Sequence, residues 1–305
     1  MIDHRLQVLR LLAEYGTVTA VAEALNYTPS AVSQQLRTLA SELGVTLLVR
    51  DGRGVRFTEA GRALLTGSNK LFATWEELRA ELDSSSGDQP GSMRLCGFST
   101  AAAALLPFVA TTLAAQRPHL SVRIIEADPD ECFRLLLCDQ ADVAVVVATS
   151  SLPPMSDPRF EQRALLDDPL DLLVAADSQF AGERSMRLSD TANQPWILDR
   201  PGRPHHQLVM TACAAAGFAP LVAHEAAEWD TGAALVGAGL GVALVPRLAR
   251  LPAGYPIRRI ALRGDPTPSR HLLTAIRSGS RGQPAVAAAL AALDEVSHRR
   301  QIHGE

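Results

Sequence analysis

Short polar side chains are concentrated in one early segment of the sequence, TPSAVSQQLRTL, which spans residues 28–39. Hydroxyl and amide groups both donate and accept hydrogen bonds, and short side chains fit a nucleic-acid groove about 12 Å wide. A glutamate in their place would repel the phosphates of such a partner. The side chains that could contact base edges or neighbouring phosphates are Thr28, Ser30, Ser33, Gln34 and Arg37. Thr28 could instead serve only as a helix cap, and Arg37 could pair only with Glu42 or stay solvated.

A second group of cations follows in LLVR, DGRG and VRF, residues 47–57. Two short β-prone runs around a turn with glycine predict a hairpin, or wing. Arg50 and Arg53 lie at or beside its tip, where Arg53 could enter a minor groove and Arg50 could touch the backbone; a bare surface charge is the alternative. From Tyr27 to Phe57 four arginines stand against two acidic residues, in a chain of net charge -4. This local excess favours attraction to a polyanion.

Other polar side chains stand where predicted helices begin in the second part of the chain. Ser99 and Thr100 follow a strand-like run and open a helix, a place suited to a carboxylate or a similar anion, with plain N-capping as the alternative. Trp229 and Thr231 flank an acid at another helix start and could meet an amine or a ring, unless Trp229 belongs to the core. The sequence predicts no metal site and no cofactor, because no Cys/His pairing has metal-ligand spacing.

The early polar segment requires helices to position it. Apolar residues at helical spacing predict a helix over residues 3–15, and Thr19 can cap a second over residues 20–25. Thr28 caps a third, with Pro29 at its first position, where the missing N–H costs nothing. Two short helices joined by a tight turn are typical of a helix-turn-helix.

A longer helix is predicted from residue 59 to residue 83. Leucines recur every seven residues along it, and two more apolar residues follow four positions after two of them, which makes a coiled-coil-like stripe. A partner helix would cover this stripe, so it predicts dimerisation; packing on its own domain is the alternative. The dimerisation candidates are Leu64, Leu71, Trp75, Leu78 and Leu82. The segment SSSGDQPGS, residues 84–92, then predicts a flexible linker.

Strand-like and helical runs alternate after that linker, which predicts parallel sheets with crossover helices. Strands are expected at 93–98, 121–127, 142–147, 195–198, 220–225 and 241–246, and helices at 100–116, 129–138, 204–216, 229–238 and 284–299. EQRALL and DLLVAA are strand-like and suited to link two lobes. The predicted domains are residues 1–58, the helix 59–83, the linker 84–92 and a two-lobed unit 93–305, with lobe I at about 93–165 and 268–305 and lobe II at about 166–267.

Bulk properties restrict the class of protein. A chain of 305 residues suggests two or three units, and no apolar run approaches the roughly 18 residues of a membrane span. The N-terminus lacks the features of a signal peptide, so we expect a cytoplasmic protein without a membrane partner. The four cysteines form no CxxC pair, so buried thiols are the expectation and a redox pair of Cys132 and Cys138 stays open.

The chain resembles LysR-type transcriptional regulators over essentially its whole length. The matching stretches are TVTAVAEALNYTPSAVSQQLRTLASELGVTLLVR and GRGVRFTEAGRALL, with weaker echoes in FSTAAAALLPFVA, ADVAVVV and VGAGLGVALVPRLA. Many members have Gln-Pro directly after the capping hydroxyl, whereas here Pro29 and Ser30 follow Thr28, so the base preferences at that position do not transfer.

The resemblance implies an α/β protein with an N-terminal winged helix-turn-helix, a dimerising helix and a two-lobed effector domain like that of periplasmic binding proteins. It also implies a homodimer or homotetramer that binds double-stranded promoter DNA and responds to a small molecule; RNA polymerase is a further candidate partner. It puts a pocket wall at residues 199–206, where Arg203 or His205 could reach an effector, and the adjacent His205 and His206 point about 100° apart on a helix, a poor metal pair. Arg203 and the helix starts point to an anionic effector such as an amino acid or an aromatic acid.

The predicted function is therefore that of a sequence-specific regulator with an effector. An enzyme is not expected, because the sequence has no GxSxG, HExxH, GxGxxG or Walker motif in the required context. A transport receptor is disfavoured by the front domain and the missing signal peptide. An architectural DNA-binding protein without an effector remains the alternative.

Overall fold

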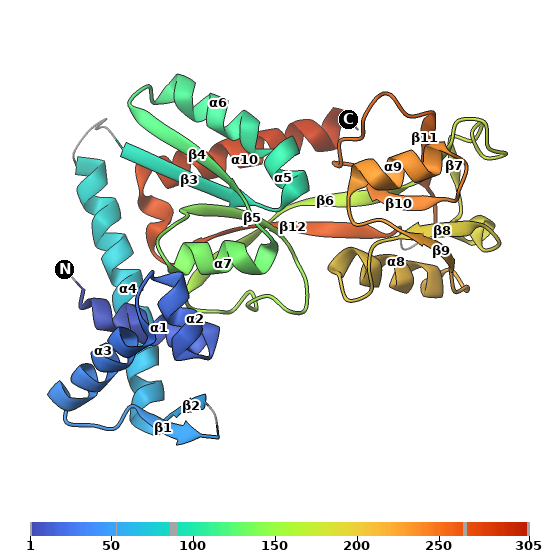
Figure 1. Ribbon diagram of the computed structural model, residues 1–305. Helices are drawn as coiled ribbons and strands as arrows, with labels where there is room; N and C mark the ends of the chain where they lie inside the picture. Colours follow the sequence, from blue (N-terminus) through green and yellow to red (C-terminus); the bar gives the residue numbers. More distant parts are fainter. Residues whose placement is uncertain (1, 53, 86–90, 265–266, 304–305) are drawn as a thin grey trace.

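The computed structural model describes residues 2–52, 54–85, 91–264 and 267–303 (Figure 1). Arg53, predicted to contact DNA from the wing tip, lies outside these ranges. The chain forms a small helical domain with a hairpin, one long helix, and a two-lobed α/β unit (Figure 1). None of the helices in these ranges is long and apolar enough to cross a membrane.

The N-terminal domain contains the predicted helix-turn-helix and hairpin. Its elements are α1 His4–Tyr15, α2 Val18–Ala24, α3 Pro29–Glu42, β1 Leu48–Asp51 and β2 Gly54–Phe57. Thr28 caps α3 as predicted, because its hydroxyl accepts a hydrogen bond from Ala31 N at 3.2 Å. The prediction that Thr19 caps α2 was wrong. The cap is Thr17, whose hydroxyl accepts a hydrogen bond from Ala20 N at 3.2 Å. The reason is Gly16, which ends α1 at φ 72 and leaves the next residue extended and ready to cap.

The long helix α4, Glu59–Ser85, extends two residues beyond the predicted end at residue 83. Strand β3, Gly91–Gly97, also begins inside the predicted linker 84–92. At the start of α4, the Thr58 hydroxyl accepts a hydrogen bond from Gly61 N at 3.0 Å. A Cβ on Gly61 would lie 2.2 Å from the Leu47 carbonyl oxygen, so the close approach of helix and hairpin requires glycine here.

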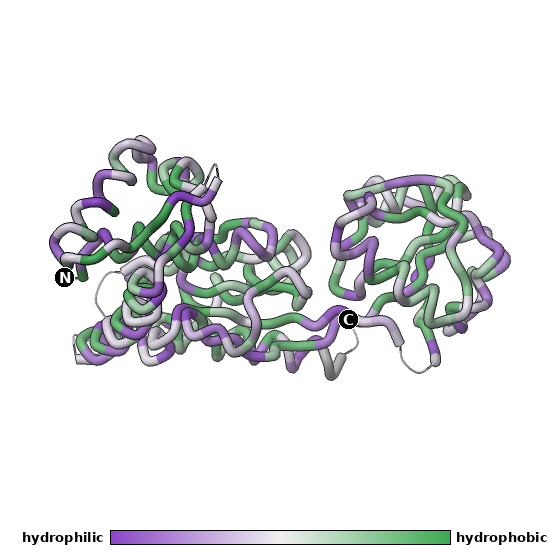
Figure 2. The backbone as a smooth tube through the Cα atoms, turned by 90° about the horizontal axis from the view of Figure 1, so that it is seen from below, coloured by the Kyte–Doolittle hydropathy of each residue, from purple (hydrophilic) through white to green (hydrophobic). Residues whose placement is uncertain are grey.

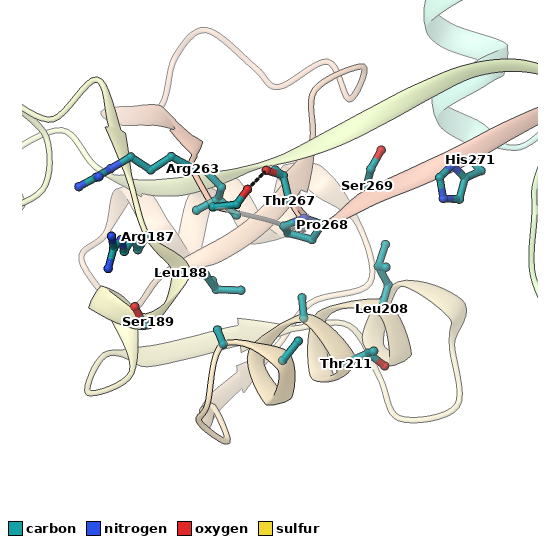
Figure 3. Close-up of a pocket in the computed structure, with 15 residues that line it drawn as sticks. Arg187, Leu188, Ser189, Leu208, Thr211, Arg263, Thr267, Pro268, Ser269 and His271 are labelled. Carbon is teal, nitrogen blue, oxygen red and sulfur yellow. Dashed lines mark hydrogen bonds between the residues drawn. The ribbon is translucent and has the colours of Figure 1, made fainter.

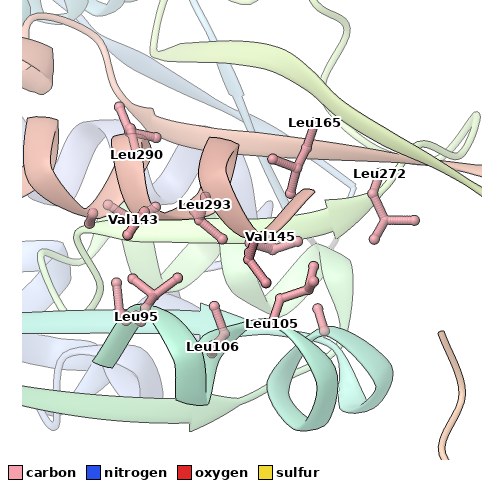
Figure 4. Packing of buried hydrophobic residues seen from close by; sticks show 14 of the residues in the cluster. Leu95, Leu105, Leu106, Val143, Val145, Leu165, Leu272, Leu290 and Leu293 are labelled. Atoms are coloured by element: carbon pink, nitrogen blue, oxygen red, sulfur yellow. The ribbon is translucent and has the colours of Figure 1, made fainter. Parts of the chain in front are cut away.

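Lobe I is a sheet covered by helices on both faces (Figure 1). Its further elements are α5 Ser99–Ala104, α6 Leu106–Gln116, β4 Leu120–Glu126, α7 Pro129–Leu137, β5 Val143–Val147, η2 Ser280–Gly282 and α10 Pro284–His303. The single helix predicted over 100–116 is thus two helices, because Pro107 has no N–H to donate and its ring clashes with the preceding turn. Leucines and valines from β3, β5, α6 and α10, together with alanines from α5, fill the core (Figure 4).

Two strands carry the chain between the lobes. Strand β6, Phe160–Ala175, leaves lobe I, and β12, Ser269–Arg277, returns to it. They pair antiparallel, with a register shift between Leu272 and Leu273 that leaves Leu165 without a partner in the ladder. The strand order is β4-β3-β5-β12-β6-β11-β7, where β11 is Ile257–Leu262 and β7 is Ser185–Met186. Strand β10, Ala243–Pro246, also pairs with β6. The predicted parallel arrangement therefore holds for β3, β4 and β5, and the sheet becomes mixed where the crossing strands join.

Lobe II has its own core, and Figure 2 shows it as a separate body with a hydrophobic interior. Its elements are β7 Ser185–Met186, η1 Leu188–Thr191, β8 Pro195–Leu198, α8 Pro204–Ala215, β9 Leu221–Glu225, α9 Trp229–Gly237, β10 Ala243–Pro246 and β11 Ile257–Leu262. The fully buried Trp196 donates its indole N–H to the Thr191 carbonyl at 3.4 Å and centres this core. The two-lobed α/β prediction is confirmed.

Candidate functional site

Helix α3 has one apolar face and one polar face. Its buried residues are Val32, Leu36 and Leu39. Thr28, Ser30, Gln34 and Arg37 are exposed, and Ser33 is half-buried. This division holds the helix on its domain by the apolar face and leaves hydrogen-bonding groups at the surface.

The exposed side chains of α3 already bond to one another. The hydroxyls of Thr28 and Ser30 are 3.0 Å apart, and Arg37 Nη2 donates to Gln34 Oε1 at 3.0 Å. The alternative in which Arg37 pairs with Glu42 is not observed, because Glu42 Oε2 lies 2.7 Å from Nη2 of Arg5. The surface of α3 therefore carries an ordered row of hydrogen-bond donors and acceptors. Water or another polar partner can replace the hydrogen bonds that these side chains now make to one another.

The hairpin next to α3 adds positive charge. Arg50 is exposed and lies opposite Val55 in the β1–β2 register. Arg56 is 3.7 Å from Asp51, and both side chains are more than half exposed, so this ion pair contributes little to stability.

Helix α4 presents different faces to different neighbours. Leu71, Leu78 and Leu82 are exposed by 46, 43 and 55%. Trp75 is half-buried, and Leu64 packs against the core of the N-terminal domain. The exposed stripe therefore runs from Leu71 to Leu82, and the N-terminal part of the predicted seam packs on its own domain instead.

A buried ion pair marks the junction of the two lobes. Arg270 on β12 lies opposite Asp168 on β6, and its Nη2 donates to Asp168 Oδ2 at 2.6 Å. The other carboxylate oxygen accepts from Leu248 N at 2.9 Å. The Arg270 guanidinium also lies over the Phe98 ring, 5.1 Å from its centroid, directly before Ser99. Sequence reasoning missed this pair, because its members are 102 residues apart and no local pattern joins them.

His205, on α8, is neutral in this site. Its Nε2 is 3.0 Å from the Leu244 carbonyl oxygen, so Nε2 carries the proton and Nδ1 is an acceptor. That Nδ1 is buried without a hydrogen-bond partner among the described residues. Burial, together with the positive charge of Arg270, lowers the pKa of His205 to about 4. The ring packs edge-on against Trp229, with 4.9 Å between the ring centroids.

The other predicted effector residues have different positions. Ser99 is exposed at the start of α5, whereas Thr100 is buried. Arg203 Nε is 3.0 Å from Oδ2 of Asp199, so part of its charge is used within the loop. Thr231 is exposed in the first turn of α9. The structure thus brings His205 into contact with Trp229 and Arg270 into contact with Phe98, and the charge of Arg270 acts on His205.

The cysteines are free thiols, and Cys96, Cys132 and Cys213 are buried as predicted. A hydrogen bond to Cys132 and burial raise the pKa of Cys96, and burial raises the pKa of Cys213 to about 12. Cys138 is half-buried, and its pKa is also raised by burial. A raised pKa keeps the Cys96, Cys138 and Cys213 thiols protonated near neutral pH, which lowers their reactivity.

Comparisons with known proteins agree with this arrangement. The family model described as the LysR substrate binding domain matches residues 86–297, and the bacterial regulatory helix-turn-helix protein model of the lysR family matches residues 4–62. The dual regulator GltC of Bacillus subtilis is 27% identical over 218 residues, 71% of each chain. The probable regulator LrrA of Synechococcus elongatus is 29% identical over 248 residues, 81% of this chain and 82% of its own.

Two solved structures show the same fold. Full-length OxyR of Pseudomonas aeruginosa, in a point variant, superposes with a TM-score of 0.66 at 20% identity and covers 98% of this chain and 95% of its own. Full-length CbnR in complex with its target DNA gives 0.56 at 22% identity, over 97 and 100% of the two chains. With both family models matched in order, the chain belongs to the LysR family of DNA-binding transcriptional regulators that carry an effector-binding domain.

Proposed function

We propose that two or four copies of this protein assemble on promoter DNA, that each inserts α3 into a major groove, and that a small molecule bound between the lobes changes this binding. The observation that carries the proposal is the two-faced α3, with three buried apolar residues and a surface row of hydroxyl and amide groups. The proposed domains are the N-terminal unit to residue 58, the helix Glu59–Ser85, and an effector unit that begins with β3 at Gly91.

The DNA contacts follow from the positions of the polar groups. Ser33 and Gln34, near the middle of the exposed face, are assigned to base edges, and Gln34 can address adenine with its amide. Thr28 and Ser30 lie at the helix N-terminus, where hydroxyl and backbone N–H groups suit a phosphate. Arg37 and Arg50 add charge for the backbone or for guanine.

Pairing of subunits makes DNA binding through α3 selective for a particular base sequence. A single domain makes few base contacts, and each mismatch costs about 1–3 kcal/mol. Two N-terminal domains on a two-fold symmetric DNA site double the number of base contacts that must match. The exposed leucines of α4 supply the surface for the pair, since an apolar stripe gains free energy when a second copy covers it.

The effector is assigned to the lobe junction, with Ser99, His205, Trp229 and Arg270 around it. His205 Nδ1 is a neutral, buried acceptor, so it selects a ligand with an N–H or O–H donor. Trp229 offers a ring face or edge for an apolar or aromatic body. The hydroxyls of Ser99 and Thr231 can bind a carboxylate, so an amino acid or an aromatic acid fits best.

The same proposal places the protein in the cytoplasm, without catalytic activity and with RNA polymerase as a candidate partner. The family consists of transcriptional regulators, and an effector domain matches residues 86–297. An architectural role without an effector is therefore not favoured.

The test is a titration of the full chain with a fluorescent duplex that carries the sequence footprinted upstream of its own gene, and with a scrambled duplex. Gln34→Ala is expected to weaken binding to the footprinted duplex about tenfold, because a good base contact is worth about 1–3 kcal/mol. Binding to the scrambled duplex should not change. Gln140→Ala, on an exposed turn of lobe I, is the matched control. Equal losses on both duplexes would contradict the assignment of Gln34 to a base.

A further inference from the structure

A cavity of about 490 Å³ opens on the flank of lobe II. It lies between α8, η1, the end of β11 and the start of β12 (Figure 3). Small-molecule sites in proteins have volumes of roughly 300–1,000 Å³. The size of this cavity is therefore that of a ligand site.

One face of α8 and two neighbouring leucines form an apolar floor. The residues that contribute are Leu188, Leu208, Ala212, Ala215, Ala216 and Leu262. Small alanines recur at helical spacing on α8, so the helix surface is recessed opposite the strands. Such a floor favours an unbranched or ring-shaped hydrocarbon body.

Positive charge is concentrated at one end of the cavity. Figure 3 shows Arg187 and Arg263 at this end, and Ser269 and His271 at the other. Neither guanidinium forms an ion pair with a described carboxylate, and the nearby Asp190 accepts a hydrogen bond from the backbone N of Arg187 at 3.2 Å. Arginine forks of this kind bind carboxylates through charge-assisted hydrogen bonds.

The cavity is separate from the effector site at the lobe junction. Successive side chains of a strand point to opposite faces, so Ser269 and His271 line the cavity while Arg270 points to the other face of β12. There Arg270 is buried against Asp168 and Phe98. A ligand in the cavity would thus contact the back of the strand whose front carries the lobe-junction ion pair.

We propose that this cavity is a second small-molecule site, which takes an anionic amphiphile. The carboxylate of the ligand lies between Arg187 and Arg263, and its hydrocarbon body lies on the floor made by α8.

Calorimetric titration of the full chain with octanoate and with 1-octanol tests the charge preference. Octanoate is expected to bind at least about tenfold more tightly, because the alcohol cannot engage both arginines as an anion does. Arg187→Gln and Arg263→Gln should each reduce this preference. Arg258→Gln, an exposed arginine of β11 outside the cavity, is the matched control and should leave it unchanged. Equal affinity for acid and alcohol, or no binding of octanoate, would overturn the proposal.

A second pair of variants tests the location. Ala215→Phe fills the cavity and should abolish octanoate binding, whereas Ala214→Phe, exposed on the same helix, should retain it. The thermal unfolding midpoint of each variant checks that it folds. Binding that survives Ala215→Phe but is lost in Trp229→Ala would place octanoate at the lobe junction and overturn the second site. That result would leave the proposed effector site intact, and failure at the cavity is thereby separable from failure of the proposed function.

Discussion

His205 shows how a single residue becomes specialised by its surroundings. Its Nε2 proton is committed to the Leu244 carbonyl, and Trp229 covers one edge of the ring. Protonation of Nδ1 would place a charge in a buried site beside the positive Arg270, which is why the pKa falls to about 4. The residue is therefore a neutral acceptor at physiological pH.

A pH dependence of stability follows from this shift. The unfolded chain binds a proton at His205 below about pH 6.5, whereas the folded protein resists it until about pH 4. The free energy of unfolding is therefore expected to fall as the pH drops through this window, by about 3 kcal/mol from this group. His205→Gln should remove that part of the loss, and His206→Gln should keep it. Urea denaturation at pH 7.0 and pH 4.5 measures both, and an unchanged pH dependence in His205→Gln would refute the assignment.

The amino-acid sequence was enough to predict the polar residues of α3, but not the residues at the lobe junction. The polar residues of α3 could be found because helical period, cap and side-chain type all occur within 12 residues of sequence. The Arg270–Asp168 pair could not, because its partners meet only when β6 and β12 pair across the lobes. Arg203 was a plausible anion ligand in sequence, and its nearby Asp199 shows that a charge has to be counted with its neighbours.

At the scale of elements, α4 contacts both the N-terminal domain and lobe I, and it leaves a third face exposed. Its first turns pack on the N-terminal domain, its middle docks on lobe I, and its leucine stripe is exposed. Gly279 (φ 87) fixes the docking, since a Cβ there would lie 2.2 Å from the Ala73 carbonyl oxygen. The buried Glu76 accepts a hydrogen bond from Gln283 Nε2 at 2.7 Å. The heptad pattern predicted the stripe but gave no sign of the docked face, because glycine and glutamine signal no partner in sequence.

Leu78→Glu is expected to convert the assembled protein to monomers or to weaken the assembly at least tenfold. In a two-fold pair the two new carboxylates would face each other in an apolar seam, which costs more than their exposure in a monomer. Sedimentation equilibrium of wild type and variant measures the change. Thr66→Glu adds the same charge at an exposed position more than 100° around the helix from Leu78, and should leave the assembly intact. Dissociation of both variants alike would argue against the stripe as the interface.

The broken helix after β3 was within reach of sequence reasoning. Pro107 interrupts a run whose hydrophobic period suggested one helix over 100–116, and proline inside a helix removes a hydrogen bond and clashes with the turn before it. The hydrophobic period favours one helix, but the backbone chemistry of Pro107 divides it into two. The β-strands of lobe I, with continuous runs of valine and isoleucine, were predicted almost at their observed bounds.

At the scale of the whole molecule, the N-terminal domain is docked on lobe I of its own chain. Buried residues of α1 and α7 belong to one hydrophobic cluster. Gln7 Nε2 donates to the Leu137 carbonyl, and Arg159 Nη1 lies 2.7 Å from Glu14 Oε2. The sequence gives no sign of this docking, because contacts over more than 100 residues of separation leave no local pattern.

The docking predicts that α1 and α7 are stabilised together. Glu14→Gln removes a largely buried charge from Arg159 and is expected to speed amide hydrogen exchange roughly tenfold in both helices, since a hydrogen bond to a charged group contributes about 1.5–3 kcal/mol. Hydrogen exchange read by mass spectrometry on the free protein measures this. Glu23→Gln, exposed on α2, is the control. Faster exchange confined to α1 would show that the two domains open independently.

The connection between the lobes is a paired ribbon of β6 and β12. Rotation of one lobe relative to the other must therefore twist the hydrogen-bonded ladder formed by β6 and β12. The ladder is weakest where Leu165 has no partner opposite Leu272 and Leu273, because a bulge interrupts pairing and increases local twist. The ribbon should therefore twist most easily at this register shift. How easily it twists depends on the residues that pack around Leu165.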